Sequence, residues 1–148
     1  MEIRVRADPE PDIDLLYHHQ FEIYREAYLI WDRETWEEIA AVCDVYRIEV
    51  DGEYAGDIIF ESRGKGGRYI VDLSILPRYQ GKGVGKRVLE LIKRREGRIT
   101  AVTRKETLDF FLKSGFVQKR RMKSYYSPGV DGYYLEYSHS RQNSPDAE

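Results

Sequence analysis

The fold is decided by residues 69–95, which read YIVDLSILPRYQGKGVGKRVLELIKRR. Apolar and β-branched residues dominate positions 69–76, and the run stops at Pro77, which has no N–H to donate to a sheet. Val84, Val88 and Leu91 then recur at the spacing of one helix face, so a helix begins close to Gly83. The stretch therefore predicts a strand, a glycine-rich turn and a helix.

The turn holds three glycines in five residues, namely Gly81, Gly83 and Gly85. Glycine accepts a positive φ and lets a ligand approach the backbone closely. The first turn of a helix has N–H groups without internal partners, and it lies at the positive end of the helix dipole. Lys82 and Lys86 add positive charge at the rim. These features predict a binding site for a phosphate or pyrophosphate group.

Two common nucleotide-binding patterns do not fit this turn. The dinucleotide pattern G-x-G-x-x-G requires a glycine where the chain has Lys86, and the P-loop pattern requires a glycine in place of Gln80. The pattern Q-x-x-G-x-G does fit, as Gln80, Gly83 and Gly85, directly after a strand that ends Ile75-Leu76-Pro77. In these residues the chain resembles the GNAT superfamily of N-acetyltransferases. The competing interpretation is an ordinary glycine-rich turn with no such ligand.

The resemblance implies that acetyl-CoA is the co-substrate. In that family the loop amides hold the pyrophosphate, and the preceding strand end holds the pantetheine arm by backbone hydrogen bonds. The implied cofactor-binding residues are Leu73, Ile75, Leu76, Gln80, Gly81, Lys82, Gly83, Val84, Gly85 and Lys86, with Arg104 and Phe111 from a later segment. No metal is expected, because the adjacent His18 and His19 point to different faces of a helix.

Length and composition suit one domain, which we place at residues 1–138, followed by a polar tail at 139–148 that we expect to be disordered. Cys43 is the only cysteine, so no internal disulfide can form. The chain shows no signal peptide and no apolar run of about 20 residues. Its net charge of −2 gives no basic excess. We therefore expect a cytoplasmic protein that binds neither membrane nor nucleic acid, with a homodimer as one candidate oligomeric state.

Hydrophobic periodicity and turn residues predict the remaining elements. Asp12 is placed to cap one helix, a second helix is expected to begin after Asp32, and Asp51-Gly52 between alternating apolar runs predicts a tight hairpin. Strands are expected at 2–6, 45–50, 53–61, 69–76, 98–102, 117–126 and 132–137, and a further short helix at 106–114. The order is β-α-α-β-β-β-α-β-α-β-β, which is the GNAT element order. The fold class is α/β (α+β), with a mixed, mostly antiparallel, twisted sheet flanked by helices.

A second segment, TRKETLDFFLKSGF at residues 103–116, is similar to the GNAT segment N-x-x-A-x-x-x-Y-x-x-x-G-F. Phe111 stands where many members have the tyrosine that protonates the leaving thiolate, and phenylalanine has no proton to give. Tyr125 or Tyr126 on the next strand supplies that proton, or the thiolate leaves unassisted, or the protein binds acyl-CoA without efficient turnover. Tyr126 is our candidate general acid.

Two carboxylates are candidate general bases. Asp72 lies within an apolar strand, where a carboxylate is unusual unless it is paired or functional, and it shares a strand face with Ser74. Glu106 lies at the start of the next helix, where an acidic residue also favours the helix dipole. The resemblance further implies that the first two helices and their connection form a wall of the acceptor site. Tyr24, Tyr28 and Trp31 are therefore candidate acceptor-binding residues, with core packing as the alternative interpretation.

These residues predict an enzyme, an acetyl-CoA-dependent N-acetyltransferase that moves an acetyl group to the amine of a small molecule or peptide by direct transfer. The alternative is a non-catalytic acyl-CoA-binding or regulatory module, and Phe111 is the observation that motivates it.

Overall fold

The structure is a computed structural model that describes residues 1–65 and 67–138. Seven strands form one sheet in the order β1-β2-β3-β4-β5-β7-β6, in which the β4–β5 pair is parallel. The elements are β1 (Ile3–Ala7), α1 (Ile13–Ile23), η1 (Ala27–Leu29), α2 (Arg33–Val42), β2 (Asp44–Val50), β3 (Glu53–Ser62), β4 (Gly67–Ile75), η2 (Pro77–Tyr79), α3 (Val84–Arg95), β5 (Arg98–Thr103), α4 (Lys105–Lys113), β6 (Val117–Ser127) and β7 (Val130–Ser138). Apart from the short 3-10 helices η1 and η2, this order confirms the predicted one. The predicted tail at 139–148 lies outside the described residues.

The described residues form two compact units, one of Met1–Glu61 with Val71–Val88 and one drawn from Ser62–Ile70 with Leu89–Glu148. In the first unit β2 pairs antiparallel with β1 and β3. The predicted β2–β3 hairpin is confirmed, with φ of 50° at Asp51 and 84° at Gly52. A type I′ turn needs positive φ at both central residues, which is why Asp-Gly fits.

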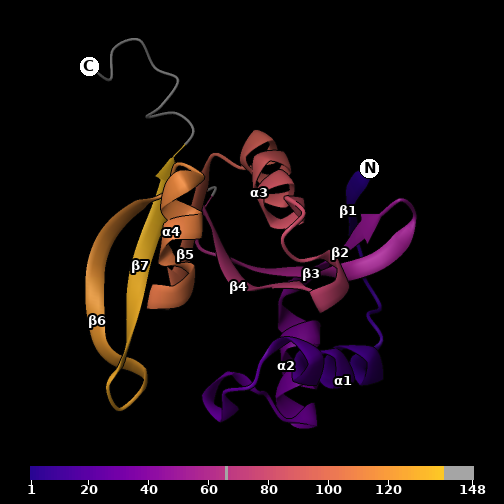
Figure 1. Cartoon of the computed structure of the whole chain (residues 1–148), viewed down its shortest axis with the longest axis horizontal. Coiled ribbons are helices and arrows are strands. Elements are labelled where there is room, and N and C mark those ends of the chain that lie inside the picture. The colour runs from indigo at the N-terminus through magenta and orange to yellow at the C-terminus, as the bar shows by residue number, and fades with distance from the viewer. Residues whose placement is uncertain (66, 139–148) are drawn as a thin grey trace. The chain divides into compact units, whose positions relative to one another are not determined.

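Helices α1 and α2 lie together against the strands of this unit (Figure 1). Each begins at the predicted position, because Asp12 accepts a hydrogen bond from Leu15 N–H and Asp32 accepts one from Thr35 N–H. Their apolar faces meet the sheet in a core cluster of Leu16, Trp36, Val45 and Ile59, against which Val71 of β4 also packs.

In the second unit β7 pairs antiparallel with both β5 and β6, and Gly67–Ile70 of β4 runs parallel to Arg98–Ala101 of β5. Helix α4 lies across β7, and the β6–β7 hairpin extends beyond the helix (Figure 1). The core of the second unit includes Ile99, Leu135 and Tyr137. None of the helices in 1–65 and 67–138 combines the length and apolar character needed to span a bilayer.

Candidate active site

The glycine-rich turn after β4 is tied to the end of that strand by one side chain, and its glycines leave the space above it open. Gln80 Nε2 donates a 2.7 Å hydrogen bond to the carbonyl of Ile75, which ties the turn to the end of the strand. Gly81 and Gly83 have φ of 74° and 80°, a region that favours glycine. A Cβ built on either glycine meets no atom within 4 Å, so the space above both is open. The turn therefore presents bare backbone to solvent.

Helix α3 begins at Val84, as predicted, and its first intrahelical hydrogen bond runs from Arg87 N–H to Gly83 C=O at 3.0 Å. The N–H groups of residues 84–86 precede that bond, so they point out of the first turn. Lys82 and Lys86 are exposed beside them. This geometry fits a pyrophosphate, because backbone donors and the positive helix end face open space and two exposed lysines flank them in the sequence.

Asp72 on β4 lies at the centre of a small hydroxyl network within the same unit. The Tyr24 hydroxyl donates to its Oδ1 at 3.0 Å, and Ser74 Oγ donates to its Oδ2 at 2.5 Å. Burial raises the pKa of the Asp72 carboxyl, and the hydrogen bonds from Ser74 and Tyr24 act in the opposite direction. Asp72 and Ser74 do share a strand face, as the sequence indicated. The structure thus brings together a predicted base and a predicted acceptor-wall residue.

The backbone around this network is fixed by an unusually close approach between β3 and β4. Gly56 has φ of 155°, and a Cβ built on it would lie 1.9 Å from the carbonyl oxygen of Ser74. The pairing of β2 with β3 shifts register next to this residue, which is the mark of a β-bulge. Ala55 C=O accepts from Leu76 N–H at 2.8 Å just beyond it. Only glycine fits here, so this residue fixes the position of the strand that carries Asp72.

Sequence reasoning missed a second buried carboxylate, Asp57 on β3. It is only 4% exposed and accepts a hydrogen bond from the Tyr54 hydroxyl. Burial is the main cause that raises the pKa of Asp57 to about 7, and the negative charge of Asp72 adds to the rise. The signal was in the sequence, because Asp57 interrupts an apolar strand in the same way as Asp72.

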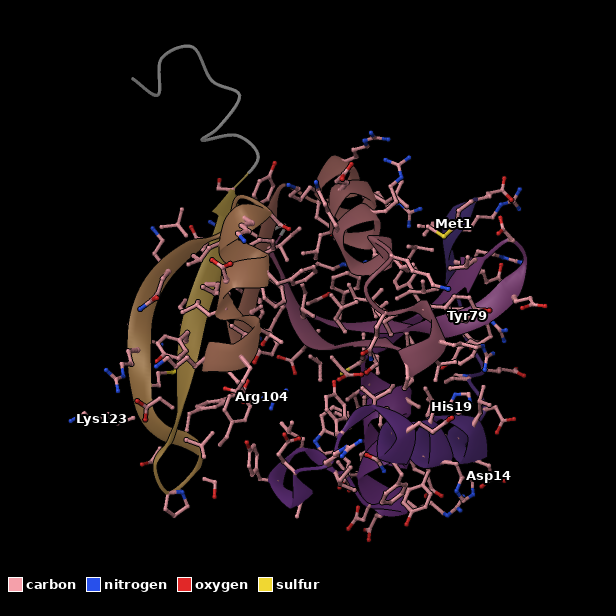
Figure 2. The ribbon with its side chains drawn as sticks, viewed as in Figure 1. Met1, Asp14, His19, Tyr79, Arg104 and Lys123 are labelled. Atoms are coloured by element: carbon pink, nitrogen blue, oxygen red, sulfur yellow. The ribbon has the colours of Figure 1, made fainter. Side chains whose placement is uncertain are left out.

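Tyr54 is in turn enclosed by side chains from two other elements. His19 on α1, labelled in Figure 2, stacks on the Tyr54 ring with 5.2 Å between ring centroids, and the Arg47 guanidinium lies 5.1 Å from that ring. Burial raises the pKa of the Tyr54 hydroxyl, and the charge of Asp57 raises it further. Tyr54 therefore stays a neutral donor to Asp57 at ordinary pH.

The connection between α1 and α2 holds the other predicted acceptor residues. Helix α1 ends at Ile23, so Tyr24 is its C-cap and Tyr28 lies in η1. Gln20 binds Trp31 twice, donating from Nε2 to the carbonyl at 2.7 Å and accepting from the N–H at 2.9 Å. The Trp31 ring packs edge-on to Trp36 at 4.8 Å, beside the core cluster. The packing interpretation accounts for Trp31, whereas Tyr24 reaches Asp72.

The remaining predicted residues belong to the second unit. Arg104, labelled in Figure 2, precedes α4, and its guanidinium pairs with Glu106 at 3.1 Å. Glu106 is 62% exposed, which suits a surface ion pair at a helix start. Tyr126 donates its hydroxyl to the carbonyl of Val102 at 3.1 Å, so its proton already has an acceptor in this arrangement.

Phe111 is a packing residue in this arrangement. It is 7% exposed, and its ring lies 5.3 Å from that of Phe116. Phe116 N–H bonds to Phe111 C=O, Gly115 N–H bonds to Leu112 C=O, and Gly115 has φ of 93°. Those are the two hydrogen bonds of a Schellman motif, which is usually accompanied by this kind of apolar contact.

Known proteins provide an independent comparison. A family model described as an acetyltransferase (GNAT) domain matches residues 41–118, and the chain belongs to this family of acetyltransferases. No curated protein sequence matches the chain.

Solved structures with low sequence identity share the fold. A GNAT-family protein from Desulfovibrio desulfuricans has a TM-score of 0.75 and 14% identity, with 93% of this chain and 99% of that chain covered. The ribosomal-protein-S18-alanine N-acetyltransferase of Escherichia coli has a TM-score of 0.75 and 13% identity, covering 93% and 94%. A GNAT acetyltransferase from Elizabethkingia anophelis, solved with acetyl-CoA bound, has a TM-score of 0.72 and 13% identity, covering 92% and 97%.

Proposed function

We propose that this protein is an N-acetyltransferase that moves the acetyl group of acetyl-CoA to a primary amine, with Asp72 as the base. The observation that carries the proposal is the hydroxyl-bound carboxylate of Asp72 on the strand that leads into the glycine turn. An amine of pKa ~10.4 is mostly protonated near pH 7 and must lose a proton before it can attack. A carboxylate of raised pKa is suited to take that proton.

Each residue of the site then has a defined task. When bound, acetyl-CoA supplies an acyl group activated as a thioester. The turn amides and Lys82 hold an anion, and Tyr24 and Ser74 orient the Asp72 carboxylate. Asp72 accepts the amine proton, directly or through water. The new C–N bond replaces the C–S bond, and the thiolate leaves unassisted or takes a proton from a hydroxyl.

The charge of the first unit supports a cationic acceptor. Its residues include eighteen aspartates and glutamates against nine lysines and arginines, and three of those nine cations lie at 82–87 beside the glycine turn. Two of these carboxylates, Asp57 and Asp72, lie close enough that the charge of Asp72 raises the pKa of Asp57. A field of this sign attracts an ammonium group and repels an anionic acceptor.

Thermal melting with acetyl-CoA, CoA and ATP tests the donor site. Acetyl-CoA at about 100 times Kd stabilises by about 2.7 kcal/mol, which raises Tm by several degrees in a domain of this size. Gly83→Glu puts a carboxylate into the anion site and should abolish the rise. Gly129→Glu is the matched control, because Gly129 has φ of 79° and equally open space but lies in the β6–β7 turn. No rise with the wild-type protein, or equal loss in both variants, would refute the donor site.

Phe111 favours a second candidate, a module that binds acyl-CoA without turning it over. Amine-dependent release of CoA, measured over a panel of polyamines, amino acids and peptides, separates the two. A module predicts the acetyl-CoA melting shift with no amine-dependent release for any acceptor. Release that disappears in Asp72→Asn, while the melting shift remains, supports the enzyme.

A further inference from the structure

The net charge of the chain conceals a strong segregation of charge. The described residues of the second unit include fourteen lysines and arginines against six aspartates and glutamates. The first unit has the opposite excess. The near-neutral total is therefore a sum of two opposite excesses, and the expectation that nucleic acid is excluded rested only on that total.

Much of the excess lies on β6, which is the last strand in the sheet order. Lys119, Arg120, Arg121 and Lys123 are all exposed within five residues of this edge strand. Asp131 of β7 binds Arg121 at 2.5 Å and lies within the field of Lys123. Figure 2 shows Lys123 at the outer edge of the β6–β7 hairpin. The other carboxylate of β7, Glu136, lies opposite Val117 and pairs with Arg98 at 2.9 Å, so only Asp131 pairs with the cations of β6 among the described residues.

Tyrosine rings accompany Arg120 on the sheet face opposite α4, whereas Arg121 pairs with Tyr133 in the register and points to the other face. Arg120 pairs with Tyr134 in the register, and its guanidinium lies 5.1 Å from that ring. Tyr125 is 49% exposed and packs edge-on to Tyr126 at 4.9 Å. Leu135 and Tyr137 alternate with Tyr134 along β7 and are buried, so Tyr134 points to the other face. We call Lys119, Arg120, Lys123, Tyr125 and Tyr134 the β6 surface.

We propose that the β6 surface binds single-stranded nucleic acid, with its cations on the phosphates and its tyrosines against the bases. Guanidinium and ammonium groups neutralise successive phosphates, which gives affinity without sequence preference. Exposed aromatic rings stack on bases of any identity. The proposal goes beyond acetyl transfer and does not depend on it.

Two features favour nucleic acid over an acidic polypeptide as the occupant. The surface combines cations with tyrosines along one edge strand, and acidic side chains have no flat ring that a tyrosine can stack on. Its arginines present planar donors that match phosphate oxygens in pairs. A lysine on an edge strand also protects against aggregation, but that role requires neither the cluster of cations nor the tyrosines.

Fluorescence anisotropy with a labelled oligouridine of about 16 nucleotides tests the proposal on the full chain. The triple variant K119Q/R120Q/K123Q leaves the Arg121–Asp131 pair intact. It should weaken binding at least about tenfold and reduce the slope of log K against log salt by about 2. The matched control R4Q/R25Q/R33Q removes the same number of exposed cations from the first unit and should leave both quantities unchanged.

A second variant separates stacking from charge. Tyr125→Ala should lower affinity severalfold without changing the salt slope. Should the triple variant misfold in a melting assay, K119E alone is used and should weaken binding in the same direction. Three results would overturn the proposal: no binding by the wild type at about 50 mM salt, equal effects of both triple variants, or competition by poly-glutamate as strong as by unlabelled oligouridine.

Discussion

Replacing Asp57 with asparagine should make the protein more stable at neutral and alkaline pH. Asp57 is 4% exposed, and its pKa rises from an ordinary 3.8 to about 7, chiefly because burial removes water from the carboxylate. The folded state therefore keeps a proton that the unfolded chain loses. The contribution of this group to the free energy of unfolding is fully present at a pH below its pKa in the unfolded chain. It is lost as pH rises through its pKa in the folded state.

The magnitude follows from the size of the shift. A difference of about 3 pKa units corresponds to about 4 kcal/mol at ~1.36 kcal/mol per unit, reached once the pH exceeds the folded pKa. Most of this loss, about 2–3 kcal/mol, falls between about pH 5 and pH 8. Asparagine cannot ionise and still accepts the Tyr54 hydroxyl, so Asp57→Asn avoids the loss.

Thermal melts from about pH 5 to pH 8 measure this difference. Relative to Asp57→Asn, the wild type should lose roughly 5–10 °C of Tm across the range, at about 2–4 °C per kcal/mol. Asp109→Asn is the control, because its carboxylate is 72% exposed, and it should follow the wild type. Parallel curves for the wild type and Asp57→Asn would refute the argument that burial holds the Asp57 proton.

Three further substitutions test the site. Asp72→Asn should lower kcat/KM for amine acetylation by about 10²–10⁴ in a CoA-release assay without changing the acetyl-CoA melting shift, and unchanged kinetics would remove Asp72 as the base. Phe111→Tyr buries a hydroxyl in a packed position, so chemical denaturation should show a loss of about 1–3 kcal/mol with no gain in turnover; a faster enzyme would contradict the packing role. Gly56→Ala places a Cβ 1.9 Å from Ser74 O and should lower the unfolding free energy by at least about 2 kcal/mol; wild-type stability would show that the backbone can yield there.

The fold was predictable because the signals that begin its helices and form its turns act between residues close together in the sequence. Asp12 and Asp32 begin their helices by accepting backbone N–H groups one turn ahead, and Asp51-Gly52 has the φ angles that its turn requires. Each of these depends on neighbours along the chain. The glycine turn was predictable for the same reason, because Gly83 has a positive φ and its carbonyl accepts the hydrogen bond from Arg87 N–H at the start of α3.

The site was less predictable because it depends on contacts between distant residues. Helix α1 ends at Ile23, and the hydroxyl of Tyr24 reaches Asp72, 48 positions further along the chain, a contact that no local pattern indicates. Asp57 interrupts an apolar strand as Asp72 does, but the proximity of the two carboxylates arises only when β3 and β4 meet in the sheet. The bulge at Gly56 left no pattern that periodicity detects. Charge segregation was hidden because composition averages over the whole chain.

The double hydrogen bond of Gln20 has a consequence for how acceptor preference can change. One side-chain amide both donates to and accepts from the Trp31 backbone, as the backbone of a paired strand would. Glutamate has no donor for this task, and asparagine is one methylene shorter. Residues 21–30, which include the end of α1, Tyr24 and η1, are thereby tied at both ends. We expect that the other residues of this segment can be replaced, with Gln20, Tyr24 and Trp31 kept, without separating α1 from α2.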